Sequence, residues 1–133
     1  MARILVIDDD RLVRGTIQGM LAADAHECVL AIDGEDGVRQ FQVEQIDLVL
    51  CDIYMPRQDG LETIREIRRL SGSVPIVAMT GSYARATGGG RLAPEFLETS
   101  TQAGATKTIA KPFRLEELLG IVRKSLGPAP TGT

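Results

Sequence analysis

Short apolar segments alternate with amphipathic segments along the whole chain, and this alternation restricts the possible folds more than any other feature. The apolar runs are rich in β-branched residues, as buried strands are, and cover residues 3–7, 28–32, 47–51, 74–79 and 106–110. Helices are predicted at residues 11–23, around Val38 and Phe41, at 61–70, from Pro94 onward, and at 114–126. Strands that alternate with helices predict an α/β fold, a doubly wound five-stranded parallel sheet with helices on both faces.

Length and composition restrict the class of protein. A chain of 133 residues forms one domain of ordinary size, which we predict at residues 1–126, with 127–133 as a disordered tail or linker stub. The net charge is -3 and no basic run is present. No apolar stretch approaches the roughly 20 residues that span a bilayer, and no signal cleavage site follows Met1. We therefore expect a cytoplasmic domain without direct nucleic-acid binding or membrane insertion.

The cysteines and the histidine indicate neither a disulfide scaffold nor a multi-histidine metal site. Cys28 and Cys51 lie 23 residues apart, and we interpret both as buried thiols in a reducing compartment. The single histidine, His26, follows the helix at 11–23, where we expect it to be solvated.

Two helices carry more detailed predictions. Asp10 is placed to cap the helix at 11–23, whose apolar positions are Leu12, Ile17, Met20 and Leu21. In the helix at 61–70 the apolar residues recur every three positions, at Leu61, Ile64, Ile67 and Leu70. Its outer face carries Arg65, Glu66, Arg68 and Arg69, which we interpret as a solvated surface.

Polar side chains follow the predicted strands where each strand ends. These are Asp8, Asp9 and Asp10 after the first strand, then Asp52, Thr80 and Lys111 after the third, fourth and fifth. In a doubly wound sheet such residues converge at one crevice. Clustered carboxylates repel unless a cation neutralises them, and oxygen ligands select a hard ion such as Mg²⁺. With a hydroxyl and a lysine beside the ion, the pattern predicts phosphoryl transfer to a carboxylate.

Four motifs occur in order along the chain, namely Ile4-Leu5-Val6-Ile7-Asp8-Asp9-Asp10, Cys51-Asp52-Ile53-Tyr54-Met55-Pro56 with Asp59-Gly60, Met79-Thr80-Gly81, and Lys111-Pro112-Phe113. Together they are similar to the receiver domain of two-component response regulators, which has a flavodoxin-like fold, over about residues 2–126. The resemblance implies that Asp52 is the phosphoacceptor and that Thr80 and Lys111 bind the phosphoryl oxygens. It also implies that Asp9, Asp52 and the Tyr54 backbone carbonyl ligate Mg²⁺, with Asp8 acting through a water molecule and Mn²⁺ able to replace the magnesium.

A phosphorylation-dependent signalling switch is the function that this resemblance implies. A sensor histidine kinase or a His-phosphotransfer protein would donate the phosphoryl group. The chain would catalyse only its own phosphotransfer and autodephosphorylation, and is otherwise not an enzyme. A downstream protein would bind the surface of the fourth helix, fifth strand and fifth helix. No output module is visible after the last helix, so we expect a stand-alone receiver.

Two departures from the receiver pattern stand out. The place of the usual aromatic residue on the fifth strand is taken by Thr108, so an aromatic switch is not expected. Thr80 and Lys111 are 31 residues apart, which exceeds the usual family spacing. The added length holds Gly88-Gly89-Gly90, followed by a short fourth helix from Pro94 with Phe96 and Leu97 as its apolar face. We hypothesise that this helix is mobile and is preceded by an extended loop.

Several alternatives remain open. The chain is also consistent with the receiver portion of a larger multidomain regulator, or with a receiver that binds a partner without phosphorylation. A haloacid dehalogenase-type phosphatase is a weaker match, because Asp8-Asp9-Asp10 only loosely imitates its Asp-x-Asp motif. A flavin carrier lacks support, since no phosphate-cradling loop follows the first strand. A register shifted by one residue would make Asp10 a metal ligand.

Overall fold

The computed structural model describes residues 1–54, 60–81 and 94–127, and for 94–97 the backbone alone. The strands form one parallel sheet in the order β2-β1-β3-β4-β5. They are β1 (Arg3–Ile7), β2 (Glu27–Ala31), β3 (Leu48–Asp52), β4 (Ile76–Thr80) and β5 (Lys107–Ala110). The helices are α1 (Arg11–Ala22), α2 (Gly34–Val43), α3 (Gly60–Leu70), α4 (Pro94–Ala103) and α5 (Leu115–Leu126). The predicted doubly wound α/β fold is confirmed.

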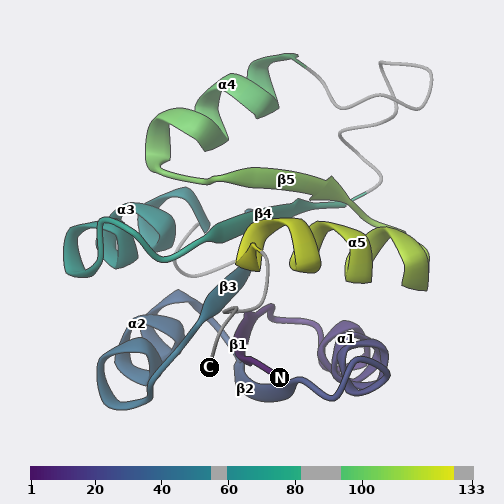
Figure 1. The fold of residues 1–133 in the computed structure, drawn as a ribbon. Coiled ribbons are helices and arrows are strands. Elements are labelled where there is room, and N and C mark those ends of the chain that lie inside the picture. The colour runs from purple at the N-terminus through teal and green to yellow at the C-terminus, as the bar shows by residue number, and fades with distance from the viewer. Residues whose placement is uncertain (55–59, 82–93, 128–133) are drawn as a thin grey trace.

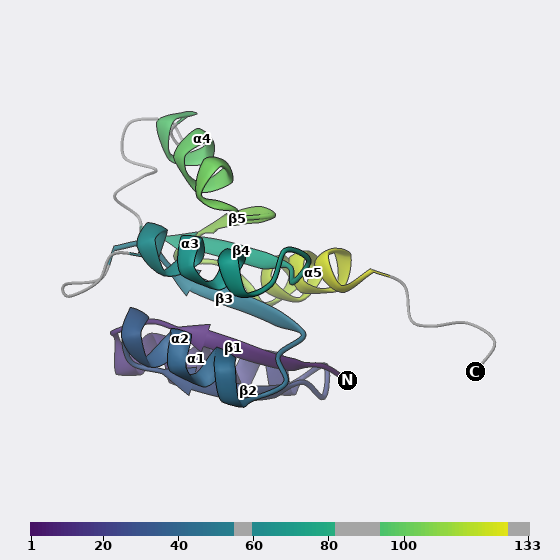
Figure 2. The ribbon, with the colours of Figure 1, turned by 90° about the vertical axis from the view of Figure 1, so that its left-hand side faces the viewer.

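The helices cover both faces of the sheet. Figure 1 shows α1 and α5 on one side and α2 and α3 on the other, and Figure 2 shows the second face from the front. Side chains of successive strand residues point to opposite faces, so Ile4 and Val6 belong to the core beneath α1 and α5, whereas Leu5 and Ile7 belong to the core beneath α2 and α3. This two-sided burial explains why the strands appear in the sequence as continuous apolar runs.

Leu12 and Leu70 are predicted core positions that the structure places at the surface, and helix geometry gives the reason. Leu12 is 80% exposed and Leu70 is 48% exposed, whereas Ile17, Ile64 and Ile67 are buried. At about 100° per residue, a spacing of three drifts around the helix, so that Leu70 points about half a turn away from Leu61. Leu12 lies about 140° from Ile17 by the same rule.

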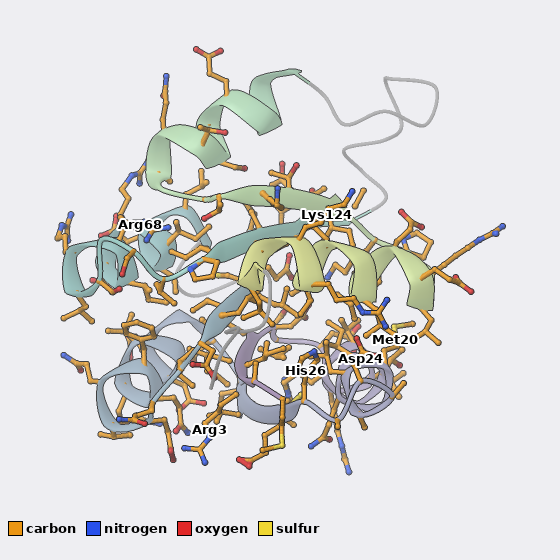
Figure 3. The ribbon with its side chains drawn as sticks, viewed as in Figure 1. Arg3, Met20, Asp24, His26, Arg68 and Lys124 are labelled. Atoms are coloured by element: carbon orange, nitrogen blue, oxygen red, sulfur yellow. The ribbon has the colours of Figure 1, made fainter. Side chains whose placement is uncertain are left out.

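Arg68 is not part of a solvated face, in contrast to the prediction. Its guanidinium donates to the carbonyl oxygen of Gly104 at 2.7 and 3.2 Å, to that of Val74 at 2.8 Å and to that of Ser71 at 3.1 Å. Figure 3 shows Arg68 between α3 and the turn that leads from α4 into β5. The side chain therefore ties the end of α3 to the entrances of β4 and β5.

His26 is likewise not simply solvated. Its Nδ1 atom accepts a hydrogen bond of 3.1 Å from the backbone amide of Ala2, and its Nε2 atom is buried without a partner in the described part of the chain. Figure 3 shows His26 near the end of α1, across from α5. Both cysteines are free thiols, as predicted; Cys51 is buried, but Cys28 is only half-buried.

The fourth helix begins at Pro94, as the sequence predicts, and ends at Ala103. The extended loop expected at 82–93, the side chains of Phe96 and Leu97, and residues 128–133 of the expected tail lie outside the described residues. The mobility of α4 stays a prediction. Of the helices that the structure describes, none has the length and apolar character needed to cross a bilayer.

Candidate functional site

The register of the parallel sheet brings the predicted site residues together at one edge. Ile7 pairs with Cys51, so the residues that follow them, Asp8 and Asp52, are neighbours. Thr80 pairs with Ala110 at the next strand junction, and Lys111 comes directly after this pair. Strand pairing therefore brings together residues as far apart in the sequence as Asp8 and Lys111, which are separated by 103 residues. The predicted convergence of these strand ends is confirmed.

Three carboxylates form an acidic pocket at this edge. Oxygen atoms of Asp8, Asp9 and Asp52 all lie within 4.8 Å of one another, with Asp8 and Asp52 buried and Asp9 exposed. Like charges at this separation repel strongly when water is excluded. The pocket is therefore a place where a cation is favoured.

Lys111 supplies a positive charge inside the pocket. Its Nζ atom lies 3.0 Å from Asp8 Oδ2 and 3.4 Å from Asp52 Oδ2. Burial alone would lower the pKa of Lys111, but the neighbouring carboxylates of Asp52 and Asp8 outweigh it and raise that pKa. Lys111 is thus a permanent cation that bridges the two buried acids.

Asp52 is the most electrostatically perturbed of the acids. Only 4% of its surface is exposed, and burial, followed by the charge of Asp8, raises its pKa to about 6. Lys111 and a 3.3 Å hydrogen bond from the Tyr54 amide act in the opposite direction. Burial and the nearby Asp8 charge therefore make the ionised form of Asp52 unfavourable. A cation that binds the carboxylate, or an electrophile that reacts with it, removes this unfavourable charge.

Thr80 presents a buried hydroxyl without a partner. The residue has no exposed surface, and its Oγ1 atom makes no hydrogen bond within the described chain. Unpaired buried hydroxyls are rare because they cost free energy. The hydroxyl lies at the end of β4, next to the strand that carries Asp52, and is therefore free to donate to a group that enters the site.

Asp10 caps a helix, whereas Asp8 and Asp9, the other two acids of its motif, belong to the acidic pocket. Its Oδ1 atom accepts hydrogen bonds from the backbone amides of Leu12 at 2.9 Å and Val13 at 3.4 Å, which caps α1 as predicted. Its own amide donates to Asp8 Oδ1 at 2.9 Å. The shifted register that would make Asp10 a metal ligand is not the one observed.

Gly60 shapes the backbone around Asp52. Its amide donates to the carbonyl oxygen of Ile53 at 2.8 Å, and a Cβ atom at this position would lie 2.0 Å from the carbonyl oxygen of Asp52. Because the obstructing atom belongs to the backbone, a larger residue forces the chain apart. The sequence identified Asp59-Gly60 only as part of a turn, and residues 55–59 lie outside the described chain.

The donor set fits a hard divalent ion. All the side-chain ligands that the pocket offers are oxygens, and Mg²⁺ binds through one or two carboxylates while keeping several waters. The exposure of Asp9 leaves the pocket open to those waters. The acidic pocket could thus bind a hard divalent metal beside Thr80 and Lys111.

One contact at the site was missed by the sequence analysis. Arg14, on the second turn of α1, donates from Nη1 to the carbonyl oxygen of Asp8 at 2.7 Å. No local pattern distinguishes Arg14 from an ordinary surface arginine, because its partner is a backbone atom in the preceding loop.

Comparison with known proteins gives a consistent result. A family model described as the response regulator receiver domain matches residues 4–123. The response regulator MprA of Mycolicibacterium vanbaalenii is 38% identical over 124 residues, which cover 93% of this chain and 50% of that protein. MprA of Mycobacterium ulcerans is 37% identical with the same coverage. The chain thus spans about half the length of these curated relatives.

Solved structures agree with these sequence matches. The chemotaxis protein CheY4 of Vibrio cholerae superposes with a TM-score of 0.83 at 26% identity, covering 94% of this chain and 98% of that one. A CheY-like receiver domain protein from Methanospirillum hungatei has a TM-score of 0.82 at 25% identity, covering 95% and 94%. Both similarities extend over nearly the whole chain.

Proposed function

Because the chain belongs to the response regulator receiver domain family, we propose that it is a phosphorylation-dependent switch in which Asp52 accepts a phosphoryl group. One observation carries this proposal: a buried Asp52 carboxylate faces Lys111 and Asp8 beside the Thr80 hydroxyl, which has no partner among the described residues. An unpaired buried hydroxyl costs free energy unless a group that enters the site accepts its hydrogen bond. A phosphoryl group on Asp52 would provide the acceptor.

The transfer step needs Asp52 in its ionised form. The P–N bond of a donor phosphohistidine breaks as a P–O bond to the Asp52 carboxylate forms. Lys111 then exchanges its 3.4 Å contact with Asp52 for a phosphoryl oxygen while it keeps Asp8. The Thr80 hydroxyl donates to a second phosphoryl oxygen, which gives this buried group the partner that it lacks.

Mg²⁺ would be held by Asp9 and Asp52, with the Tyr54 backbone carbonyl as a further ligand and Asp8 acting through water. When bound, it neutralises the charge that accumulates on the phosphoryl oxygens. The chain's own contribution is to hold the three carboxylates within 4.8 Å of one another before the ion arrives. We expect Mn²⁺ to replace Mg²⁺ because it accepts the same oxygen ligands.

The phosphodonor would approach beside α1. A groove of about 330 Å³ runs between α1 and the segment after β5, with Leu12, Val13, Met20 and Phe113 among its lining residues. Lys111 lines the same groove, so a histidine kinase or His-phosphotransfer protein seated there is next to the acidic pocket. The phosphodonor protein would cover the exposed apolar side chain of Leu12, which explains why this residue can lie at the surface.

The output surface would be formed by α4, β5 and α5. Thr80 and Lys111 lie at the two strand ends that lead into this region, so movement of either residue toward a phosphoryl group would displace its backbone. Thr108, which is half-buried on β5, occupies the place of the aromatic residue usual in receivers. A change of rotamer of an aromatic side chain is therefore not the way in which this chain would signal phosphorylation. We infer that the partner is a protein, because the net charge of -3 over the 133 residues of the chain opposes binding to nucleic acid.

Intact-mass spectrometry tests the proposal. The wild-type chain and Asp52→Asn are incubated with a small phosphodonor, with Mg²⁺ or with EDTA. We expect the wild-type chain to gain one phosphoryl group only when Mg²⁺ is present, and the Asn variant to gain none. Subsequent loss of the group on standing would measure the proposed autodephosphorylation.

The alternative receiver, which binds its partner without phosphorylation, makes the opposite prediction. It would gain no mass from a small donor or from histidine kinases. Generic phosphomonoester turnover, as in a haloacid dehalogenase-type phosphatase, is not expected under any of these conditions.

A further inference from the structure

Asp8 is the most tightly held residue of the acidic pocket. Its amide donates to the carbonyl oxygen of Ala31 at 3.2 Å, its Oδ1 accepts from the Asp10 amide at 2.9 Å, and its Oδ2 lies 3.0 Å from Lys111 Nζ. The fourth contact is the 2.7 Å hydrogen bond from Arg14 Nη1 to its carbonyl oxygen. Both side-chain oxygens and both backbone polar atoms of Asp8 are therefore fixed.

Asp9 is held in a very different way. Its side chain is exposed, and within the part of the chain that the structure describes no group donates a hydrogen bond to its carboxylate. The direction of this carboxylate therefore depends on the backbone that precedes it. That backbone is the peptide group between Asp8 and Asp9, whose oxygen is the atom held by Arg14.

We propose that Arg14 is a positioning residue for the metal site: its guanidinium fixes the Asp8–Asp9 peptide and so aims the Asp9 carboxylate at Asp8 and Asp52. The bond from Arg14 restricts rotation of the peptide plane that precedes Asp9, and the bond from the Asp10 amide to Asp8 Oδ1 restricts the backbone that follows it. Together they narrow the range of directions open to the Asp9 Cα–Cβ bond. Arg14 is suited to the task because it is half-buried on α1, and a planar guanidinium presents its N–H donors in a fixed geometry.

The sign of the effect separates positioning from simple electrostatics. A cation close to an acidic pocket opposes the binding of a second cation, so removal of the Arg14 charge alone would strengthen Mg²⁺ binding. Loss of the peptide anchor would weaken it, since residues that orient metal ligands typically contribute about tenfold or more to affinity. The two effects have opposite directions, which makes the measurement decisive.

Magnesium affinity is measured by NMR titration of the folded ¹⁵N-labelled chain, with the Asp9, Asp10 and Tyr54 amides followed. This inference rests on the proposed function, so the wild-type chain is titrated first. We expect Arg14→Met to raise the Mg²⁺ dissociation constant about tenfold, and Arg14→Lys to fall between this variant and wild type. The matched control is Arg11→Met, which removes the same charge from an exposed position on the same helix.

The outcomes are separable. Weaker binding in Arg14→Met and unchanged or tighter binding in Arg11→Met support the positioning role. If Arg14→Met binds Mg²⁺ as tightly as wild type or more tightly, the inference is overturned and the proposed function stands. A wild-type chain that shows no response to Mg²⁺ would overturn the metal site itself.

A structural role of Arg14 would lower the urea midpoint without moving the dissociation constant, so both quantities are measured on each variant. Should Arg14→Met not fold, Arg14→Lys decides the matter alone. It keeps the charge but has a shorter reach, and an unchanged dissociation constant in this variant would overturn the inference. The rate of phosphorylation as a function of Mg²⁺ concentration provides a second readout. Loss of a positioning residue should raise the Mg²⁺ concentration that gives half the maximal rate more than it lowers the rate at saturating Mg²⁺.

Discussion

Asp52 should destabilise the metal-free protein at neutral pH, so Asp52→Asn should be more stable than wild type. The pKa of Asp52 is raised from 3.8 to about 6 by burial and by Asp8. A raised folded-state pKa means that the folded protein binds the proton more tightly than the unfolded chain does. The stability that this proton confers is complete below about pH 4 and is lost as the pH rises through about 6.

The magnitude follows from the size of the shift. About two pKa units correspond to about 3 kcal/mol near pH 7.5 and to roughly half of that near pH 5. Asparagine has the same shape, does not ionise and can still accept the hydrogen bond from the Tyr54 amide. The pKa of about 6 already includes the opposing effect of Lys111, which keeps its 3.0 Å contact with Asp8, so we expect a net gain of about 2 to 3 kcal/mol near pH 7.5.

Urea unfolding followed by circular dichroism, in EDTA, measures the difference. The advantage of Asp52→Asn should shrink as the pH is lowered from 7.5 to 5. Asp10→Asn is the matched control, because asparagine caps a helix about as well as aspartate. Mg²⁺ should reverse the order, since binding to the folded wild type adds about 1.4 kcal/mol for each tenfold excess over the dissociation constant. An Asn variant that is no more stable than wild type in EDTA near pH 7.5 would refute the reasoning.

Three further predictions concern folding and site geometry. Arg68→Met should lower the free energy of unfolding by about 2 kcal/mol, because three partly buried carbonyls lose a charged donor, whereas the exposed control Arg69→Met should stay within about 0.5 kcal/mol in the same urea titration. Gly19→Ala should raise the melting temperature, since its Cβ meets nothing within 4 Å and alanine favours a helix by about 1 kcal/mol; an unchanged or lower temperature would contradict this. Gly60→Ala should both destabilise the fold and slow phosphorylation of Asp52, because its Cβ would lie 2.0 Å from a backbone oxygen; normal phosphorylation would show that the close approach can relax.

The strands and the α/β class could be predicted because they depend on local or general rules, whereas the order of the strands in the sheet comes from the structure. The continuous apolar run at β1 is buried on both faces, which only a parallel sheet covered by helices on both sides allows. Because the strands are parallel, their carboxyl ends lie at one edge of the sheet. Asp8 and Lys111, 103 residues apart, could be brought together in this way before any coordinate was known.

The errors fall where a side chain has a distant partner or where the helical period was misjudged. Arg68 was interpreted as solvated because its partner carbonyl, on Gly104, is 36 residues away. His26 has its partner in Ala2, 24 residues back. Leu70 continued a three-residue repeat that fits the helix poorly, and so faces solvent. Hydrogen bonds to backbone atoms distant in the sequence cannot be predicted from residue patterns, because only folding brings the two partners together.

The central claim is that the phosphoryl group is carried by Asp52 as an acyl phosphate, and the most direct test is to trap that bond. Chain incubated with a small phosphodonor and Mg²⁺ is reduced with borohydride, which converts an aspartyl phosphate to homoserine, and is then mapped by peptide mass spectrometry. We predict homoserine at position 52 in the Mg²⁺ sample, and aspartate there in the EDTA sample. Homoserine at Asp8 or Asp9 with an unmodified Asp52, or no homoserine in a sample whose intact mass shows phosphorylation, would contradict the account.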